Sequence, residues 1–304
     1  MKMRCVWALA LTGVVAWPAL GGAGVPSTAM PEALNGIAPA GTTCRRDEVG
    51  DARGVGRVVE APALGNADLS CALGAGELQA MRGRGAATLV DVRHAADFDA
   101  AHIEGAMNLT LTALRTKPYL RDKPLVLVGN GRGEHELYSA CGLMKAQGFR
   151  QVKVLRGGLP MWLAQGQSVV GRESLAGAVP RLSSVELWLE GQFDANLVFV
   201  TAGQAAVRER LPYVTTISEL SPAAVKALLA RRAKELKNEP FASVVLVVEP
   251  ATTAETVNAL RAAISPAPLL VYSQAADVFV REMRQLQLTW TAHARGPRQL
   301  PCGR

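Results

Sequence analysis

Short apolar runs rich in β-branched residues alternate with stretches of helical periodicity along most of this 304-residue chain. Three of these runs, at 88–90, 124–128 and 152–155, fit strands that are buried on both faces of a sheet. Between the second and third runs, apolar residues recur at helical spacing, and Gly148 then provides a natural helix C-cap. The alternation predicts an α/β fold in which helices cover both faces of a parallel sheet.

The same order of apolar runs occurs a second time, with few identical residues. The second set of strand-like runs comprises residues 197–200, 211–217, 244–248 and 269–272. A second set predicts a second α/β domain of similar topology, and the chain is long enough for both. The organisation we predict is a domain over 70–172, a linker over 173–180, and a second domain with a C-terminal tail over 181–304.

The chain's composition is that of a globular protein with real cores. Apolar residues make up 49% and charged residues 19%, a balance that excludes a disordered chain. The net charge of +7 is spread without a block of basic residues or interleaved aromatics, so we expect no nucleic-acid partner.

The N-terminus has the pattern of a secretory signal. Two basic residues, Lys2 and Arg4, precede an apolar run that ends near Pro18 and a cluster of small residues. The run is shorter than the roughly 20 apolar residues that span a bilayer, so an uncleaved anchor is the weaker interpretation. We predict a signal peptide over 1–23, cleaved after Gly21 or Ala23, no stable membrane anchor after cleavage, and a periplasmic or secreted protein.

Four cysteines remain after such cleavage, and an oxidising compartment permits them to form disulfides. They are Cys44, Cys71, Cys141 and Cys302. Their spacing resembles no zinc or Cys-x-x-Cys pattern, and the sequence leaves all three possible pairings open. Structural bridges or buried thiols are the preferred interpretation, and we expect no metal and no cofactor. The segment 24–69 contains several Gly and Pro residues and is expected to be irregular.

Several short motifs occur in a fixed order in the first predicted domain. They are Asp91-x-Arg93, Asp97-Phe98, His102-Ile103-x-Gly105-Ala106, Asn108-Leu109, Gly148-Phe149 and Val154-Leu155-x-Gly157-Gly158-x-x-x-Trp162. In these motifs the sequence resembles the rhodanese-like, or sulfurtransferase-fold, domain family. The resemblance implies two rhodanese-like domains in tandem. In the second, which lacks these motifs, the assignment rests on topology, and we interpret it as a degenerate copy.

Most of the motif residues suit structural roles. Asp91 and Arg93 can form an ion pair that fixes the turn after a strand, and His102 can join two backbone segments. Gly105, Gly157 and Gly158 allow backbone that a Cβ atom would forbid. These scaffold roles are favoured over a catalytic role for His102 or Asp91.

The resemblance also implies a nucleophile that this chain lacks. In the family, a cysteine opens the loop after the fourth strand and carries sulfur as a persulfide. Here the matching loop reads Gly129-Asn130-Gly131-Arg132-Gly133. Counting from either side places the nucleophile position at Gly129 or at Gly131, and neither is a cysteine. Cys141, on the apolar face of the predicted helix, is expected to be inert.

The glycine-rich loop retains two interpretations of equal weight. Its backbone amides and Arg132, next to a helix start, could bind a small anion, or the loop could be a solvated turn. Glu134-His135-Glu136 is a weak metal motif, because adjacent residues do not converge on one ion.

The sequence therefore predicts a catalytically inactive protein that acts as a binding or regulatory module for a protein partner or a small anion. The alternative is a thiosulfate-type sulfurtransferase or a thiol-redox protein that uses a displaced cysteine. A phosphatase of this fold ranks last, since it needs the same missing cysteine.

Overall fold

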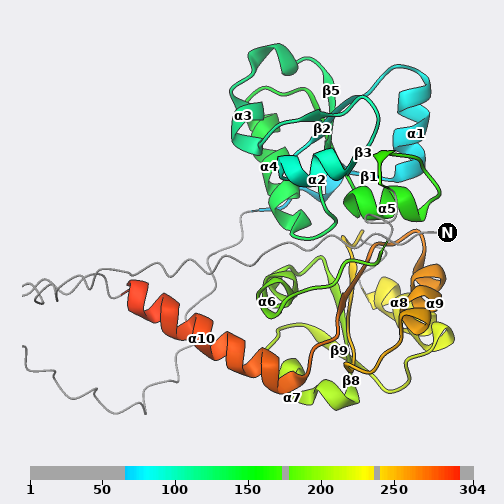
Figure 1. Cartoon of the computed structure of the whole chain (residues 1–304), viewed down its shortest axis with the longest axis vertical. Coiled ribbons are helices and arrows are strands. Elements are labelled where there is room, and N and C mark those ends of the chain that lie inside the picture. Colours follow the sequence, from blue (N-terminus) through cyan, green and yellow to red (C-terminus); the bar gives the residue numbers. More distant parts are fainter. Residues whose placement is uncertain (1–65, 173–177, 236–239, 295–304) are drawn as a thin grey trace, which may run out of the picture. The chain divides into compact units, whose positions relative to one another are not determined.

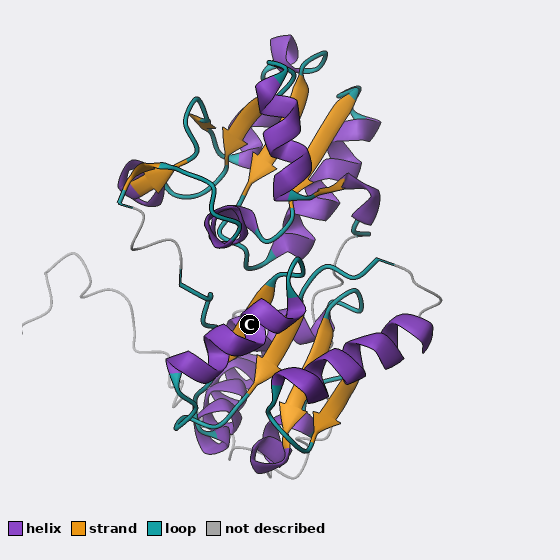
Figure 2. Ribbon diagram, turned by 90° about the vertical axis from the view of Figure 1, so that its right-hand side faces the viewer, coloured by secondary structure: helices purple, strands orange, loops and turns teal. Residues whose placement is uncertain are grey.

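The computed structural model describes residues 66–172, 178–235 and 240–294. They form two parallel β-sheets, each flanked by helices, which we call the first module (66–172) and the second module (178–294) (Figures 1 and 2). This arrangement confirms the predicted α/β class. The predicted signal peptide, Cys44, Cys302 and most of the segment 24–69 lie outside the described residues.

The first sheet has the strand order β1-β6-β5-β2-β4, and every pair is parallel. Its strands are β1 (Ala72–Leu73), β2 (Thr88–Asp91), β4 (Met107–Asn108), β5 (Pro124–Val128) and β6 (Gln151–Leu155). A small antiparallel pair, β3 (Ala101–His102) with β7 (Val170–Gly171), lies apart from this sheet. The apolar runs predicted as strands thus occupy the centre of the sheet, where both faces are buried.

Helices cover both faces of the first sheet, with α1 and α5 on one side and α3 and α4 on the other (Figure 1). Alternate residues of β5 enter different cores: Leu125 and Leu127 pack with α4, whereas Val126 and Val128 pack with α1 and α5. The helices are α1 (Ala75–Gly83), α2 (Ala95–Ala100), α3 (Leu111–Arg115), α4 (Glu134–Ala146) and α5 (Gly158–Ala164), with 3-10 turns at η3 (Leu69–Cys71) and η4 (Pro118–Leu120).

The C-terminal end of α4 follows the sequence prediction closely. Gly148 adopts φ +90°, and the amide of Phe149 donates to the carbonyl of Met144 at 3.1 Å. This left-handed cap terminates the helix and turns the chain into β6.

The second sheet has the order β11-β10-β8-β9 and is also wholly parallel. Its strands are β8 (Leu197–Thr201), β9 (Val214–Ile217), β10 (Val244–Val247) and β11 (Leu269–Tyr272). Helices α6, α7 and α10 cover one face, and α8 and α9 cover the other (Figure 1). They span α6 (Ser184–Gln192), α7 (Ala205–Arg208), α8 (Pro222–Glu235), α9 (Ala254–Ile264) and α10 (Ala276–Ala294), with a 3-10 turn at η6 (Ala202–Gln204).

The two sheets share one topology. The order β11-β10-β8-β9 matches β6-β5-β2-β4 strand for strand, in the correspondence that the repeated apolar runs suggest. Among the described residues, no helix is long and apolar enough to span a membrane.

Two segments of the second module contact the first. Phe193 and Ala242 are buried within the core cluster that includes α4, and Arg156, after β6, donates to the carbonyl oxygens of Phe241 and Ala242 at 2.7 and 2.9 Å. The loop that precedes α4 also lies next to α6, because the Gly133 amide donates to Glu190 of that helix.

Candidate site at the 129–133 loop

The glycine-rich loop connects the carboxyl end of β5 to the first turn of α4. Because β5 ends at Val128, Gly129 is the first loop residue, and α4 begins at Glu134 after Gly133, which has φ +63°. Gly129 is buried, and a Cβ atom there would lie 2.8 Å from the Leu137 side chain. The two positions that the resemblance offers for the nucleophile, Gly129 and Gly131, are both buried, and neither carries a side chain.

The loop packs backbone to backbone against the Gly157-Gly158 turn that precedes α5. The amide of Leu159 donates to the carbonyl of Gly129 at 3.0 Å. A Cβ atom on Gly131 would lie 2.6 Å from the carbonyl oxygen of Gly157, and one on Gly158 would overlap the Gly129 carbonyl. Gly131, Gly157 and Gly158 all have positive φ, so glycine is required here both by conformation and by space.

Side chains of α6 hold the outer end of the loop. The Gly133 amide donates to Glu190 Oε1 at 2.6 Å, and Arg132 pairs with Glu186 Oε1 at 3.0 Å. Arg132 also donates to the carbonyl oxygen of Arg181 at 3.3 Å. The group bound at the amino end of α4 is therefore a carboxyl group of the protein itself, Glu190, at a position that favours negative charge. Binding of an external anion by this loop stays a prediction.

Two carboxyl groups are buried at this point, Glu134 and Glu190, each about 5% exposed. Burial, and secondly the charge of Glu190, raise the pKa of Glu134 to about 8. Burial also raises the pKa of Glu190, although its hydrogen bonds from Gly133 and Asn196 oppose that shift. The Tyr138 hydroxyl donates to Glu134 Oε2 at 3.2 Å, and burial raises the pKa of this phenol as well.

The Asp91–Arg93 motif forms a structural network, in line with the scaffold interpretation. Arg93 pairs with Asp91 at 2.6 Å and donates to the carbonyl oxygen of Ala101 at 2.6 Å. The side-chain amide of Asn108 donates to the carbonyl oxygens of Asp91 and Arg93. Asp91 is fully buried, and the Arg93 guanidinium is its ion-pair partner.

The other motif residues also lie in supporting positions. His102 Nδ1 hydrogen-bonds to the carbonyl oxygen of Phe98 at 2.8 Å, and its ring stacks on Phe98. Gly105 has φ +78°, which a turn between β3 and β4 requires. Trp162 is fully buried and donates to the carbonyl of Ser168. The structure does not bring His102 or Gly105 to the glycine-rich loop.

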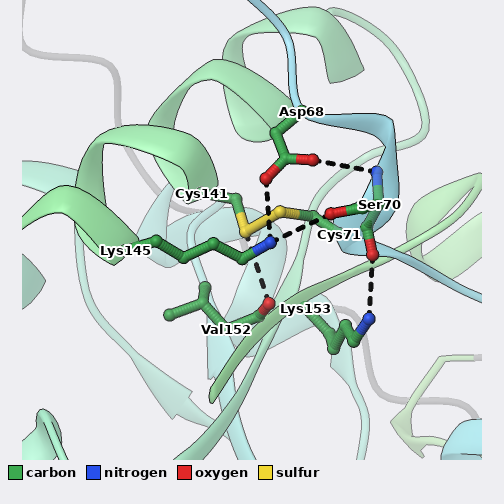
Figure 3. Close-up of a disulfide and its surroundings, with 7 residues drawn as sticks. All are labelled: Asp68, Ser70, Cys71, Cys141, Lys145, Val152 and Lys153. Atoms are coloured by element: carbon green, nitrogen blue, oxygen red, sulfur yellow. Dashed lines mark hydrogen bonds and ion pairs between the residues drawn. A yellow bond between two sulfur atoms is a disulfide. The ribbon is translucent and has the colours of Figure 1, made fainter. Parts of the chain in front are cut away.

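A disulfide joins Cys71 to Cys141 (Figure 3). The sequence had left the pairing of these cysteines open. Both cysteines are fully buried, and the bond links η3 to the middle of α4. Beside it, Lys145 pairs with Asp68 at 2.8 Å, so the first module extends before residue 70. Cys141 is therefore half of a structural bridge, one of the two forms, bridge or buried thiol, that the sequence left open for the cysteines.

The Glu134-His135-Glu136 sequence does not form a metal site. Glu134 is buried against Tyr138, whereas Glu136 is exposed on the opposite side of the helix start. Within the ranges that the structure describes, no group of three or more His, Cys, Asp or Glu side chains could hold a metal ion.

Sequence reasoning missed the α6 residues altogether. Glu186 looks like an ordinary capping-box residue, since it also accepts from the Ser183 amide. Glu190 lies 57 positions beyond Gly133, in a helix whose pattern resembles any half-exposed helix. For Glu134, the local signal in the sequence is that this glutamate directly follows the glycine-rich loop.

A comparison with known protein families finds a match that lies within the first module. The family profile described as the rhodanese-like domain matches residues 74–165, less than a third of the chain. No curated protein matches.

Several solved structures are similar to this chain. A rhodanese-related protein from Thermoplasma volcanium is 24% identical over 33% of this chain and 98% of its own, with a TM-score of 0.29. The rhodanese-like domain of an Anabaena protein is 27% identical over 34% of this chain and 81% of its own, with a TM-score of 0.30. A thiosulfate sulfurtransferase from Pseudomonas aeruginosa is 19% identical over 70% of this chain and 42% of its own, with a TM-score of 0.30.

Proposed function

We propose that this is an exported protein of two rhodanese-like modules, the second a degenerate copy, which transfers no sulfur and acts as a binding or regulatory module. The observation that carries the proposal is the residue at the start of the 129–133 loop. Sulfur transfer in the family needs a thiolate there, and this chain has Gly129 or Gly131 at that position, neither of which carries a side chain.

The described cysteines offer no replacement. Cys71 and Cys141 are bonded to each other and have no exposed surface, so neither can supply a thiolate to a donor. The amino end of α4, which would stabilise a bound sulfur anion, holds the Glu190 carboxylate instead.

Export is supported by two independent features. The first is the N-terminal pattern of basic, apolar and small residues. The second is the buried disulfide, because such bonds persist in oxidising compartments and are rare in the cytosol. Cell fractionation followed by N-terminal sequencing tests this part: we expect a periplasmic or secreted chain that starts after Gly21 or Ala23.

The assignment of the second module rests on its strand order. Its four strands follow the order of β6, β5, β2 and β4, although the loop after β10, residues 248–253, also lacks a cysteine. A second copy without the motifs fits a role in binding rather than in chemistry.

Sulfur transfer is tested with the mature chain, thiosulfate as donor and cyanide as acceptor, with thiocyanate as the product measured. The matched control is the Cys44→Ser/Cys302→Ser variant, which keeps the disulfide. We expect both proteins to form no more thiocyanate than a blank without protein, and no added sulfur by intact mass spectrometry. Thiocyanate above the blank would overturn the proposal, and its loss in the double variant would identify a displaced cysteine.

A further inference from the structure

Two buried carboxyl groups meet where α6 of the second module contacts the start of α4. Glu190 comes from α6, and Glu134 is the first residue of α4. While Glu190 is charged, its negative charge opposes the ionisation of Glu134. We call Glu134 and Glu190 the carboxyl pair.

Burial raises the pKa of Glu190, but two hydrogen-bond donors beside it favour its charged form. Its Oε1 accepts from the Gly133 amide at 2.6 Å, at the amino end of a 13-residue helix. Its Oε2 accepts from the Asn196 side chain at 2.7 Å, and Asn196 is oriented by the Ser243 hydroxyl, which donates to it at 2.7 Å. Short bonds from fixed donors and a helix amino end stabilise a carboxylate.

The surroundings of Glu134 favour its neutral form. It is buried, and its Oε1 has no hydrogen-bond partner among the described residues. An ionised carboxylate with an unsatisfied oxygen is costly in a protein interior, whereas a protonated acid is tolerated. The hydrogen-bond donors therefore favour a negative charge on Glu190 and a proton on Glu134.

The other charged groups around the pair do not compensate a second negative charge. Arg132 is already paired with Glu186, and burial lowers the pKa of His135, which packs on Phe193. Arg156 attracts Glu134, but its guanidinium donates to two backbone carbonyls of the second module. Tyr138 supplies a single hydroxyl and stays neutral.

We propose that the carboxyl pair is a proton-dependent latch between the two modules. While Glu134 is protonated, Glu190 stays bound to the Gly133 amide and α6 stays on the 129–133 loop; when Glu134 ionises, repulsion weakens this bond and exposes the loop. The device does not depend on whether the protein transfers sulfur, so its test is independent of the assay above.

The direction of the pH effect follows from linkage. In the closed state the pKa of Glu134 is about 8, whereas in an open state it returns toward its ordinary value of 4.5. The closed state therefore binds the proton more tightly, and closure is strongest in acid. The closing constant falls by up to about tenfold for each pH unit between those two values and is level above the upper one.

Hydrogen exchange of the Gly133 amide, followed by NMR and corrected for the intrinsic exchange rate, measures this closing constant. In the wild-type protein we expect its protection to fall by about tenfold or more from pH 6 to pH 8. In Glu134→Gln, which is neutral at every pH, the protection is expected to stay level. The amide of Leu246, in the centre of the second sheet, serves as the internal control and should not change.

Two further variants keep the test decisive if Glu134→Gln does not fold. Tyr138→Phe removes a hydroxyl that lowers the pKa of Glu134, so the midpoint of the change should move to higher pH. Glu190→Gln removes the charge that the Gly133 amide binds and should lower protection at every pH, with a weaker pH dependence, because burial alone then raises the pKa of Glu134. Any of three results would overturn the proposal: a flat wild-type profile, a Glu134→Gln profile with the wild-type slope, or a Tyr138→Phe profile with the wild-type midpoint.

Discussion

Reduction of the Cys71–Cys141 disulfide should selectively destabilise the first module. The bond closes a loop of 70 residues and connects η3, next to the edge strand β1, to α4. Such a crosslink restricts the unfolded chain, and for a loop of this length the restriction is worth about 4 kcal/mol. This is a large share of the roughly 5–15 kcal/mol that stabilises a typical domain.

Native-state hydrogen exchange measures the loss strand by strand. The protein is refolded with and without a reductant, and the exchange of peptides covering β5 and β6 is compared. We expect the opening free energy of these strands to fall by up to about 4 kcal/mol in the reduced protein. Peptides covering β10 should change far less, because the disulfide lies wholly within the first module.

The matched control is Cys71→Ala/Cys141→Ala, which lacks the bond in both redox states. Its exchange should not respond to the reductant, so any remaining response would come from other cysteines. If β5 in the wild-type protein changed by less than about 1 kcal/mol on reduction, the entropic argument would be refuted for this protein.

Two other substitutions test the loop and the motif network, each by urea denaturation. Gly131→Ala should lower the free energy of unfolding by about 3 kcal/mol, since the residue has φ +77° and its Cβ would lie 2.6 Å from a backbone oxygen. Gly133→Ala, where φ is +63° and the space is open, should lower it by about 1 kcal/mol. Equal costs for the two would contradict the close-packing argument. Asp91→Ala should cost about 3 kcal/mol because it leaves the Arg93 guanidinium, 10% exposed, without its carboxylate, whereas Asp122→Ala, in an exposed ion pair, should cost under about 1 kcal/mol.

The sequence by itself determined the strands and the glycine positions. The runs that became β5 and β10 are short, apolar and rich in valine, which favours strands covered on both faces of a sheet. Gly148, Gly157 and Gly158 were equally readable, because positive φ is a local requirement that the residue itself meets. The Asp91–Arg93 pair was readable for the same reason, as its partners are two positions apart.

Only the tertiary structure decided what surrounds the loop. The partner of Gly133 is Glu190, and the partner of Cys71 is Cys141, and both pairs are set by how distant elements pack. No local pattern distinguishes a glutamate that will face solvent from one that will be buried on another module. The raised pKa of Glu134 arises from burial and from a charge far away in sequence, and folding alone creates both.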